Sequence, residues 1–248
     1  MTVSTEKKNE WTLFRECFAS CLRGFGKAWK SHAKKLGLFL ALWLAVTGII
    51  IFANDWEWQR AASGWRMPEW GIDNGFRKSF CSFLKEYGDF HYFNIGLTVV
   101  IYLVGVFRKS KYLRRVALCF ALVSASAGFT VQSSKSLFGR PRPRTVLKQE
   151  DADAYKWRGP TVKGGWRSYP SGHTAATTAP CLLLAILLPR LAIPAIIFAL
   201  LVAWSRVWGD YHYPLDVVHS MGIGAFWAIL WAKAAEAPED EPESVTQA

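Results

Sequence analysis

The chain has 248 residues, of which 51% are hydrophobic, and it carries a formal net charge of +11. Such a charge suits nucleic acid, an anionic membrane surface or a phosphorylated substrate, but no basic run resembles a nucleic-acid module. The apolar residues gather in runs close to the roughly 17 to 25 residues that a bilayer-spanning helix needs, which argues against a soluble globular domain.

Residues 1–35 form a basic segment with an amphipathic pattern. Its large apolar residues recur at intervals of three and four: Trp11, Phe14, Phe18, Leu22, Phe25 and Trp29. This spacing predicts a helix, which either lies on the membrane surface or packs against the helices that follow. The lysines of this segment, Lys27, Lys30, Lys34 and Lys35, predict a cytoplasmic location.

Apolar segments then predict an all-α domain, residues 36–233, built as a bundle of six transmembrane helices. The expected spans are approximately 36–53, 92–107, 116–131, 174–189, 191–207 and 215–233. The first lacks the flanks of a cleavable signal and reads as a retained anchor. Basic residues before the first span and between the second and third place both termini in the cytoplasm. Residues 234–248 form an acidic tail that is expected to be disordered.

The segment from residue 54 to 91 lies between the first two spans and is therefore expected outside the membrane. Its tryptophans suit the headgroup region, where an aromatic ring has an apolar body and a polar edge. They are Trp56, Trp58, Trp65 and Trp70. The five cysteines show no metal-ligand spacing, and we expect no disulfide framework among them.

Polar and charged residues concentrate in three short clusters at the ends of predicted spans. The clusters cover residues 135–143, 169–173 and 205–216. The chain leaves the membrane after the third and fifth spans and re-enters at the fourth and sixth, so all three clusters lie on one face. With the orientation above, that face is the outer one, and the clusters can converge there.

Convergence would place three cations, Lys135, Arg142 and Arg206, around one pocket. Cations repel one another unless an anion holds them, and arginine offers phosphate a planar, bidentate fork. Ser171 and Gly172 precede a predicted helix, so their backbone N–H groups and the helix dipole can also face an anion. The pattern therefore predicts a phosphate site.

Two histidines in these clusters supply the groups that phosphoryl transfer needs, a nucleophile and a proton donor. Asp216 lies four residues after His212 and can accept an N–H from one ring nitrogen, which leaves the other nitrogen to attack. His173 is then the acid. Each residue also has a structural explanation, such as a helix cap for Ser171 or a dipole partner for Asp216, and it is their combination that favours catalysis.

The spacings resemble the three-part signature of the type 2 phosphatidic acid phosphatase superfamily. The matching residues are Lys135 with six residues before Arg142-Pro143, then Pro170-Ser171-Gly172-His173, then Ser205-Arg206 with five residues before His212 and three before Asp216. The resemblance implies a bacterial membrane lipid phosphatase that needs no metal or other cofactor. It also implies that His212 becomes a transient phosphohistidine, that Asp216 supports it, and that His173 protonates the leaving group and later activates water.

The substrate stays open at this point among phosphatidic acid, phosphatidylglycerol phosphate, undecaprenyl diphosphate and a lipid A phosphate. A phosphotransferase using the same phosphohistidine, or a non-catalytic transporter, is the alternative function. Arg140 and Arg144 either contact a second anionic group or line the headgroup region, and His219 either tunes the pocket or bonds a neighbouring span. We expect a bacterial inner membrane with the site facing the periplasm, and the sequence does not show an oligomeric state.

Overall fold

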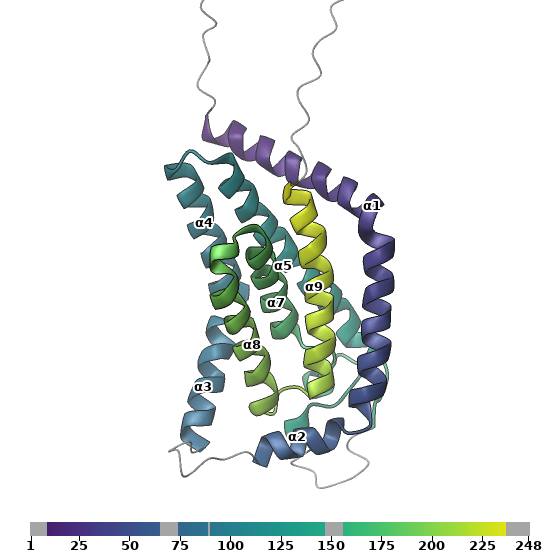
Figure 1. Ribbon diagram of the computed structural model, residues 1–248. Helices are drawn as coiled ribbons and strands as arrows, with labels where there is room; N and C mark the ends of the chain where they lie inside the picture. The colour runs from purple at the N-terminus through teal and green to yellow at the C-terminus, as the bar shows by residue number, and fades with distance from the viewer. Residues whose placement is uncertain (1–8, 65–73, 89, 147–155, 237–248) are drawn as a thin grey trace, which may run out of the picture.

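The computed structural model describes residues 9–64, 74–88, 90–146 and 156–236, and every regular element within them is a helix. Long helices run side by side along the molecule (Figure 1). They are α1 (Glu10–Phe52), α4 (Gly96–Phe107), α5 (Lys111–Phe138), α7 (Gly172–Leu187), α8 (Ala192–Trp208) and α9 (Pro214–Glu236). The all-α class predicted from the sequence is confirmed.

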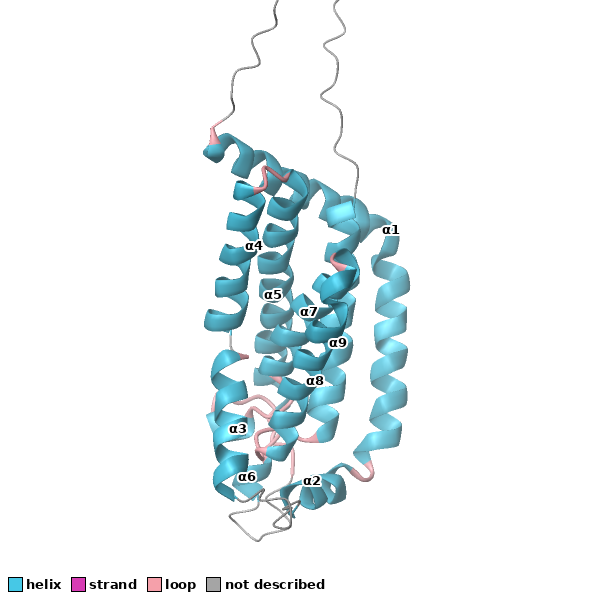
Figure 2. Ribbon diagram, turned by 60° about the vertical axis from the view of Figure 1, so that its left-hand side comes forward, coloured by secondary structure: helices cyan, strands magenta, loops and turns pink. Residues whose placement is uncertain are grey.

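Shorter helices gather toward one end of this bundle (Figure 2). They are α2 (Asp55–Gly64), α3 (Asn74–Tyr87) and α6 (Pro143–Val146), and a π-helical turn, Phe90–Ile95, leads into α4. α1 begins and α9 finishes at the opposite end (Figure 1). The segment between the first two predicted spans is therefore largely helical, although Trp65 and Trp70 lie outside the described residues.

Four stretches of the described chain are long and apolar enough to cross a membrane. These are Glu10–Phe52, Lys111–Val146, Pro189–Trp208 and Pro214–Glu236. Two shorter apolar segments, Phe93–Phe107 and Gly172–Leu187, fall on the second and fourth predicted spans. The count of six spans thus stays a prediction. α9 extends to Glu236, three residues past the predicted end of the last span, and the tail from residue 237 lies outside the described residues.

From Glu10 onward, the basic N-terminal segment and the first predicted span form one helix, so position 36 is not a helix boundary. Asn9 caps this helix by accepting the backbone N–H of Thr12 at 2.8 Å. The first half of α1 lies across the end of the bundle, and the second half runs beside α9 (Figure 1). A Cβ on Gly24 would stand 2.3 Å from the carbonyl oxygen of Ala234, so the first half packs directly on α9.

Packing against the bundle is thus one of the two arrangements expected for the amphipathic segment. The fully buried residues on its packed face are small, Cys17, Cys21, Gly24 and Ala28, and Phe14 and Phe25 of the aromatic series pack beside them, partly buried, against the core. Small residues let helix backbones approach closely. Trp29 stacks on Trp227 of α9, whereas Trp11 remains largely exposed, so a role at the membrane surface stays a prediction.

Helix α5 ends where the first polar cluster begins. Gly139 adopts a left-handed conformation, with φ of 59°, after the last helical residue, Phe138. A Cβ at Gly139 would lie 1.9 Å from the carbonyl oxygen of Gly159, so no other residue fits here without displacing backbone. After this turn the chain runs toward the start of α9, where Arg140 pairs with Asp216.

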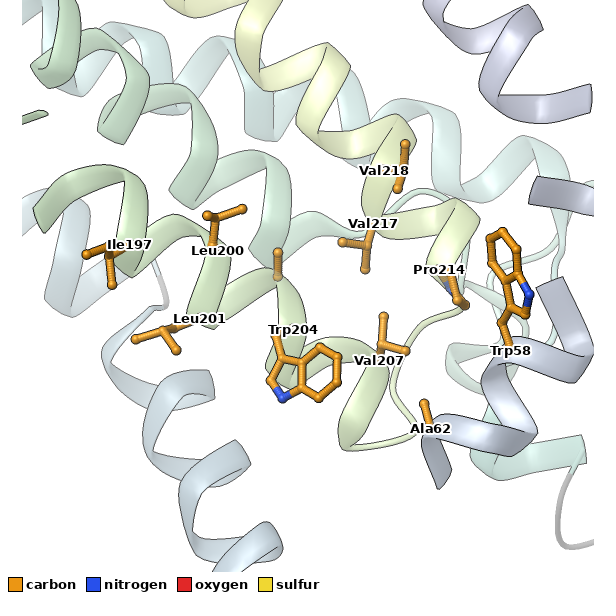
Figure 3. Close-up of a pocket in the computed structure, with 11 residues that line it drawn as sticks. Trp58, Ala62, Ile197, Leu200, Leu201, Trp204, Val207, Pro214, Val217 and Val218 are labelled. Carbon is orange, nitrogen blue, oxygen red and sulfur yellow. The ribbon is translucent and has the colours of Figure 1, made fainter. Parts of the chain in front are cut away.

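The outside of the bundle is apolar. α2, α8 and α9 enclose a groove of about 630 Å³ (Figure 3). Its lining includes Trp58, Leu200, Trp204, Pro214 and Val217, and none of its lining residues is charged. An apolar exterior of this kind suits a protein solvated by lipid chains.

Candidate active site

The three polar clusters predicted to converge do lie together, at the end of the bundle near α2 and α6. The backbone N–H of Ser171 at the start of α7 points to the carbonyl oxygen of Asp216 in α9, at 3.3 Å. The backbone N–H of Arg144 donates to the carbonyl oxygen of Asp210 at 3.2 Å, which joins the first cluster to the third. Hydropathy and loop order therefore placed the clusters correctly relative to one another.

His212 lies between α8 and α9 and is 2% exposed. Its Nδ1 is 2.7 Å from the carbonyl oxygen of Ser168 and 3.5 Å from Oδ2 of Asp216. A carbonyl oxygen only accepts, so Nδ1 carries the proton and Nε2 keeps its lone pair. The closest group to Nδ1 is thus a backbone carbonyl, whereas the sequence pattern had assigned that contact to Asp216.

The neutral state of His212 is favoured by its surroundings. Burial, the largest cause, lowers the pKa of His212 to about 3, and the nearby positive charges of Lys135 and Arg142 act in the same direction. The carboxylate of Asp216 opposes them. A neutral imidazole with a bare Nε2 is the form that can attack phosphorus.

Asp216 is fully buried, and both of its carboxylate oxygens are occupied. Oδ1 accepts from Arg140 at 2.6 Å. Oδ2 accepts from the hydroxyl of Ser168 at 2.5 Å and from the backbone N–H of Tyr213 at 3.0 Å. These donors hold the carboxylate in one orientation, with Oδ2 facing His212.

Arg140 is not where either sequence interpretation expected it, because it contacts no headgroup surface and is 0% exposed. Its guanidinium forms ion pairs with Asp216 and with Asp55 of α2. Burial raises the pKa of Asp55, the negative charge of Asp216 adds to this, and Arg140 opposes it. No sequence pattern pointed to Asp55, which lies 85 residues before Arg140.

Lys135 lies against the N-terminus of α7. A Cβ on Gly172 would stand 3.1 Å from Nζ of Lys135, so the missing side chain makes room for the ammonium group. The N–H of Ser171 is not available to an anion, because it donates to the hydroxyl of Ser220 at 2.7 Å. This corrects the expectation that both N–H groups face the phosphate. The hydroxyl of Ser171 pairs with that of Thr174 at 2.8 Å.

Arg206 is buried on the inner side of α8. Its guanidinium donates to the carbonyl oxygen of Cys81 in α3 at 2.9 Å and to the hydroxyl of Ser205. The ring of Tyr211 lies 5.0 Å from the guanidinium carbon of Arg206 and 5.1 Å from that of Arg144. Tyr211 thus connects a predicted phosphate ligand to the exposed Arg144 at the edge of the cluster.

The remaining histidines of this region differ in their surroundings. His173 occupies the first turn of α7, one residue after Gly172, and is half-buried. His219 lies one helical turn beyond Asp216, and its Nδ1 is 2.7 Å from the hydroxyl of Tyr169. Burial raises the pKa of Tyr169 to about 12, with the charge of Asp216 adding to the effect. His219 therefore bonds a neighbouring loop rather than an open pocket.

The arrangement is suited to binding a phosphate group and to nucleophilic attack on its phosphorus atom. It combines one nucleophilic nitrogen, the two nearby positive charges of Lys135 and Arg142, and the N-terminus of α7, whereas the guanidinium of Arg206 bonds to α3. Within the part of the chain that the structure describes, no group of three or more His, Cys, Asp or Glu residues could hold a metal ion.

Comparisons with known proteins agree with this geometry. The family model described as PAP2 superfamily matches residues 116–238, which hold all three clusters. Undecaprenyl-diphosphatase BcrC of Bacillus subtilis is 27% identical over 169 residues, covering 66% of this chain and 77% of that protein. A lipid A 1-phosphatase of Rhizobium johnstonii is 29% identical over 131 residues, and the match spans about half of each chain.

A solved structure shares the fold. It is the crystal structure of a transmembrane PAP2 type phosphatidylglycerolphosphate phosphatase from Bacillus subtilis. The TM-score is 0.57 and the sequence identity is 22%, over 79% of this chain and 92% of that one. The helices described above are thus arranged as in a known transmembrane protein.

Proposed function

We propose that this chain, which belongs to the PAP2 superfamily as the motif spacing indicated, is an integral membrane phosphatase that hydrolyses a lipid phosphate or lipid diphosphate. Its relatives act on undecaprenyl diphosphate and on lipid A, which are both phosphorylated lipids with apolar tails. The apolar exterior of this bundle would keep such a tail in the membrane while the headgroup reaches the site.

The reaction starts at Nε2 of His212. Its lone pair attacks phosphorus, the bond between phosphorus and the leaving oxygen breaks, and His173 gives that oxygen a proton. Water then attacks the phosphohistidine, His173 takes a proton from the water, and inorganic phosphate leaves. The observation that carries this proposal is the 2.7 Å contact between Nδ1 of His212 and the Ser168 carbonyl, because it fixes the tautomer in which Nε2 is the nucleophile.

The cations stabilise the charge that develops on the phosphoryl oxygens. Lys135, Arg142 and Arg206 hold the phosphate together with the N–H of Gly172 and the hydroxyl of Ser171. Since these groups already supply positive charge and donors, we propose that the enzyme needs no metal ion. Asp216 stabilises the positive charge that His212 acquires in the attack.

The orientation of the protein in the membrane follows from the positive charge in the loops beside its spans. We assign residues 36–233 to the membrane domain, place both termini in the cytoplasm of a bacterial inner membrane, and place the three clusters on the outer side. In support, the start of α1 and the C-terminal end of α9 lie at the end of the bundle opposite α2 and the polar clusters (Figure 1). The amphipathic first half of α1 would then rest at the inner surface of the membrane.

Phosphate release by the purified protein in detergent tests this function. The substrates are phosphatidic acid, phosphatidylglycerol phosphate, undecaprenyl diphosphate and a phosphorylated lipid A, each with EDTA present. We expect hydrolysis of at least one lipid, an acid-labile phosphoprotein intermediate, and a loss of about 10³-fold or more in His212→Ala. His32→Ala, on α1 and outside the three clusters, serves as the matched control.

Each part of the proposal has its own contrary outcome. Inhibition by EDTA would contradict the metal-free site, and transfer of phosphate to a second lipid without release to water would indicate a phosphotransferase. In intact spheroplasts, hydrolysis of a short-chain substrate added from outside supports the orientation. Hydrolysis that appears only after the membrane is broken contradicts it.

A further inference from the structure

One charged network in the site is used neither to bind phosphate nor to attack it. Arg140 is fully buried and shares its guanidinium between two buried carboxylates, Asp55 and Asp216. The guanidinium carbon also lies 4.0 Å from the ring centroid of Tyr213, which follows His212 directly. Arg140 therefore has its carboxylate partners inside the protein and does not face the substrate.

Asp55 makes a second contact that ties it to the same place. Its Oδ1 accepts the backbone N–H of Leu215, the residue before Asp216, at 2.9 Å. One carboxylate from α2 thus holds both the guanidinium that orients Asp216 and the backbone beside Asp216. Because a buried charge is costly unless it is paired, this ion-pair chain is a specific arrangement rather than a surface contact.

Ser168 connects this chain to the nucleophile. Its backbone N–H donates to the carbonyl oxygen of Arg140 at 3.0 Å, and its hydroxyl donates to Asp216 at 2.5 Å. Its carbonyl oxygen accepts Nδ1–H of His212 at 2.7 Å. A shift of Arg140 or Asp216 would consequently move the carbonyl that sets the ring orientation of His212.

We propose that Asp55 and Arg140 are positioning residues for His212, with Asp55 acting through Arg140 on Asp216 and Ser168. The inference rests on the function proposed above. The two residues touch no reacting atom, so their effect is on the rate of attack and not on substrate binding. A misplacement of about 1 Å in a reacting group can cost on the order of 10²-fold in rate.

A purely structural role gives a different expectation. If Asp55 only capped the first turn of α9 through Leu215, removal of its charge would act independently of Arg140. The effects of Asp55→Asn and Arg140→Gln would then multiply in the double variant. If Asp55 acts through Arg140, the double variant is no slower than Arg140→Gln alone.

Steady-state kinetics on the lipid that the wild type hydrolyses fastest measure whether the effects of the two substitutions are independent. Asp55→Asn is expected to lower kcat by about 10- to 100-fold, with KM changed by less than about twofold. Glu57→Gln is the matched control, since it removes an exposed carboxylate from the same helix and should leave kcat unchanged. If Asp55→Asn does not fold, the comparison of Arg140→Gln with the double variant decides the question.

A measurement without turnover separates this inference from the function. In protein labelled with ¹⁵N-histidine, the Nδ1–H proton of His212 should give a downfield, hydrogen-bonded signal, assigned by its absence in His212→Ala. We expect the signal in the wild type and in Glu57→Gln, and its loss in Asp55→Asn.

The two failures then look different. A wild type that is inactive on every lipid, with the His212 signal still dependent on Asp55, overturns the function and leaves the positioning role intact. An active wild type whose kcat and His212 signal survive Asp55→Asn overturns the positioning role and leaves the function intact. The positioning role is also overturned if the rate losses of Asp55→Asn and Arg140→Gln multiply in the double variant.

Discussion

Helices α8 and α9 carry buried polar and charged residues on their inner face and apolar residues on their outer face. On the inner face, Arg206 and Asp216 are buried, where Arg206 contacts a backbone carbonyl and the ring of Tyr211, and Asp216 pairs with Arg140. On the outer face, Trp204 and Val217 line a groove that contains no charged residue (Figure 3). In a bilayer, polar groups must form hydrogen bonds and ion pairs with one another inside the protein, because the surrounding lipid offers them no partner.

The largest expected contrast is in packing, and a matched pair of leucines measures it. Leu183 on α7 is fully buried, whereas Leu200 on α8 is 49% exposed in the groove. Leu183→Ala should lower the free energy of unfolding by about 2 to 5 kcal/mol, because it leaves a cavity, and Leu200→Ala by about 0.5 kcal/mol or less. Thermal or denaturant unfolding in detergent compares them. Equal losses would show that the groove is packed like the interior.

A second contrast is the effect on stability of adding a methyl group to a glycine that packs against another helix and to one that has open space beside it. A Cβ on Gly222 of α9 would lie 2.4 Å from Trp43 of α1, whereas one on Gly128 of α5 meets nothing within 4 Å. Gly222→Ala should destabilise the protein by about 1 to 3 kcal/mol through overpacking. Gly128→Ala should be neutral or stabilise it by up to about 1 kcal/mol. If both substitutions proved neutral in unfolding experiments, α1 would not pack on α9 as described.

The smallest contrast is a pH response that the groove, lacking titratable groups, cannot produce. His212 has a folded pKa of about 3, below its unfolded value near 6.5, so the unfolded state binds the extra proton first. Stability from this group is complete above pH 6.5 and falls by about 1 kcal/mol for each pH unit as the pH drops toward 3. Melting temperatures of the wild type should therefore decline more steeply than those of His212→Gln between pH 6.5 and 5. Parallel curves would contradict a buried neutral imidazole.

Much of the site was predictable because its residues are close in sequence to helix ends. Lys135, His173 and Arg206 stand at the termini of apolar segments, and counting the segments placed them on one face. Asp55 could not be predicted in this way, since it reaches the site from α2, whose sequence is not one of the apolar spans. Ser168 escaped notice because it acts largely through its backbone, which no residue pattern reveals.

The partners of Arg140 could not be predicted from the sequence. Its sequence neighbour Arg142 was assigned to phosphate, and nothing in a run of arginines distinguishes one that faces an anion from one that pairs with buried carboxylates. The turn at Gly139 decides which side chain points where, and that turn depends on the close approach of Gly159.

The sequence by itself determined the helical class, the positions of the apolar segments and the candidate residues for the proposed chemistry. These follow from hydropathy and from short spacings, which are local properties of the chain. The tertiary structure alone decided how the chemistry is held in place: which oxygen receives the proton on Nδ1 of His212, and which carboxylates share Arg140. Those contacts join residues that are far apart in the chain, and only the packing of α2, α5 and α9 brings them together.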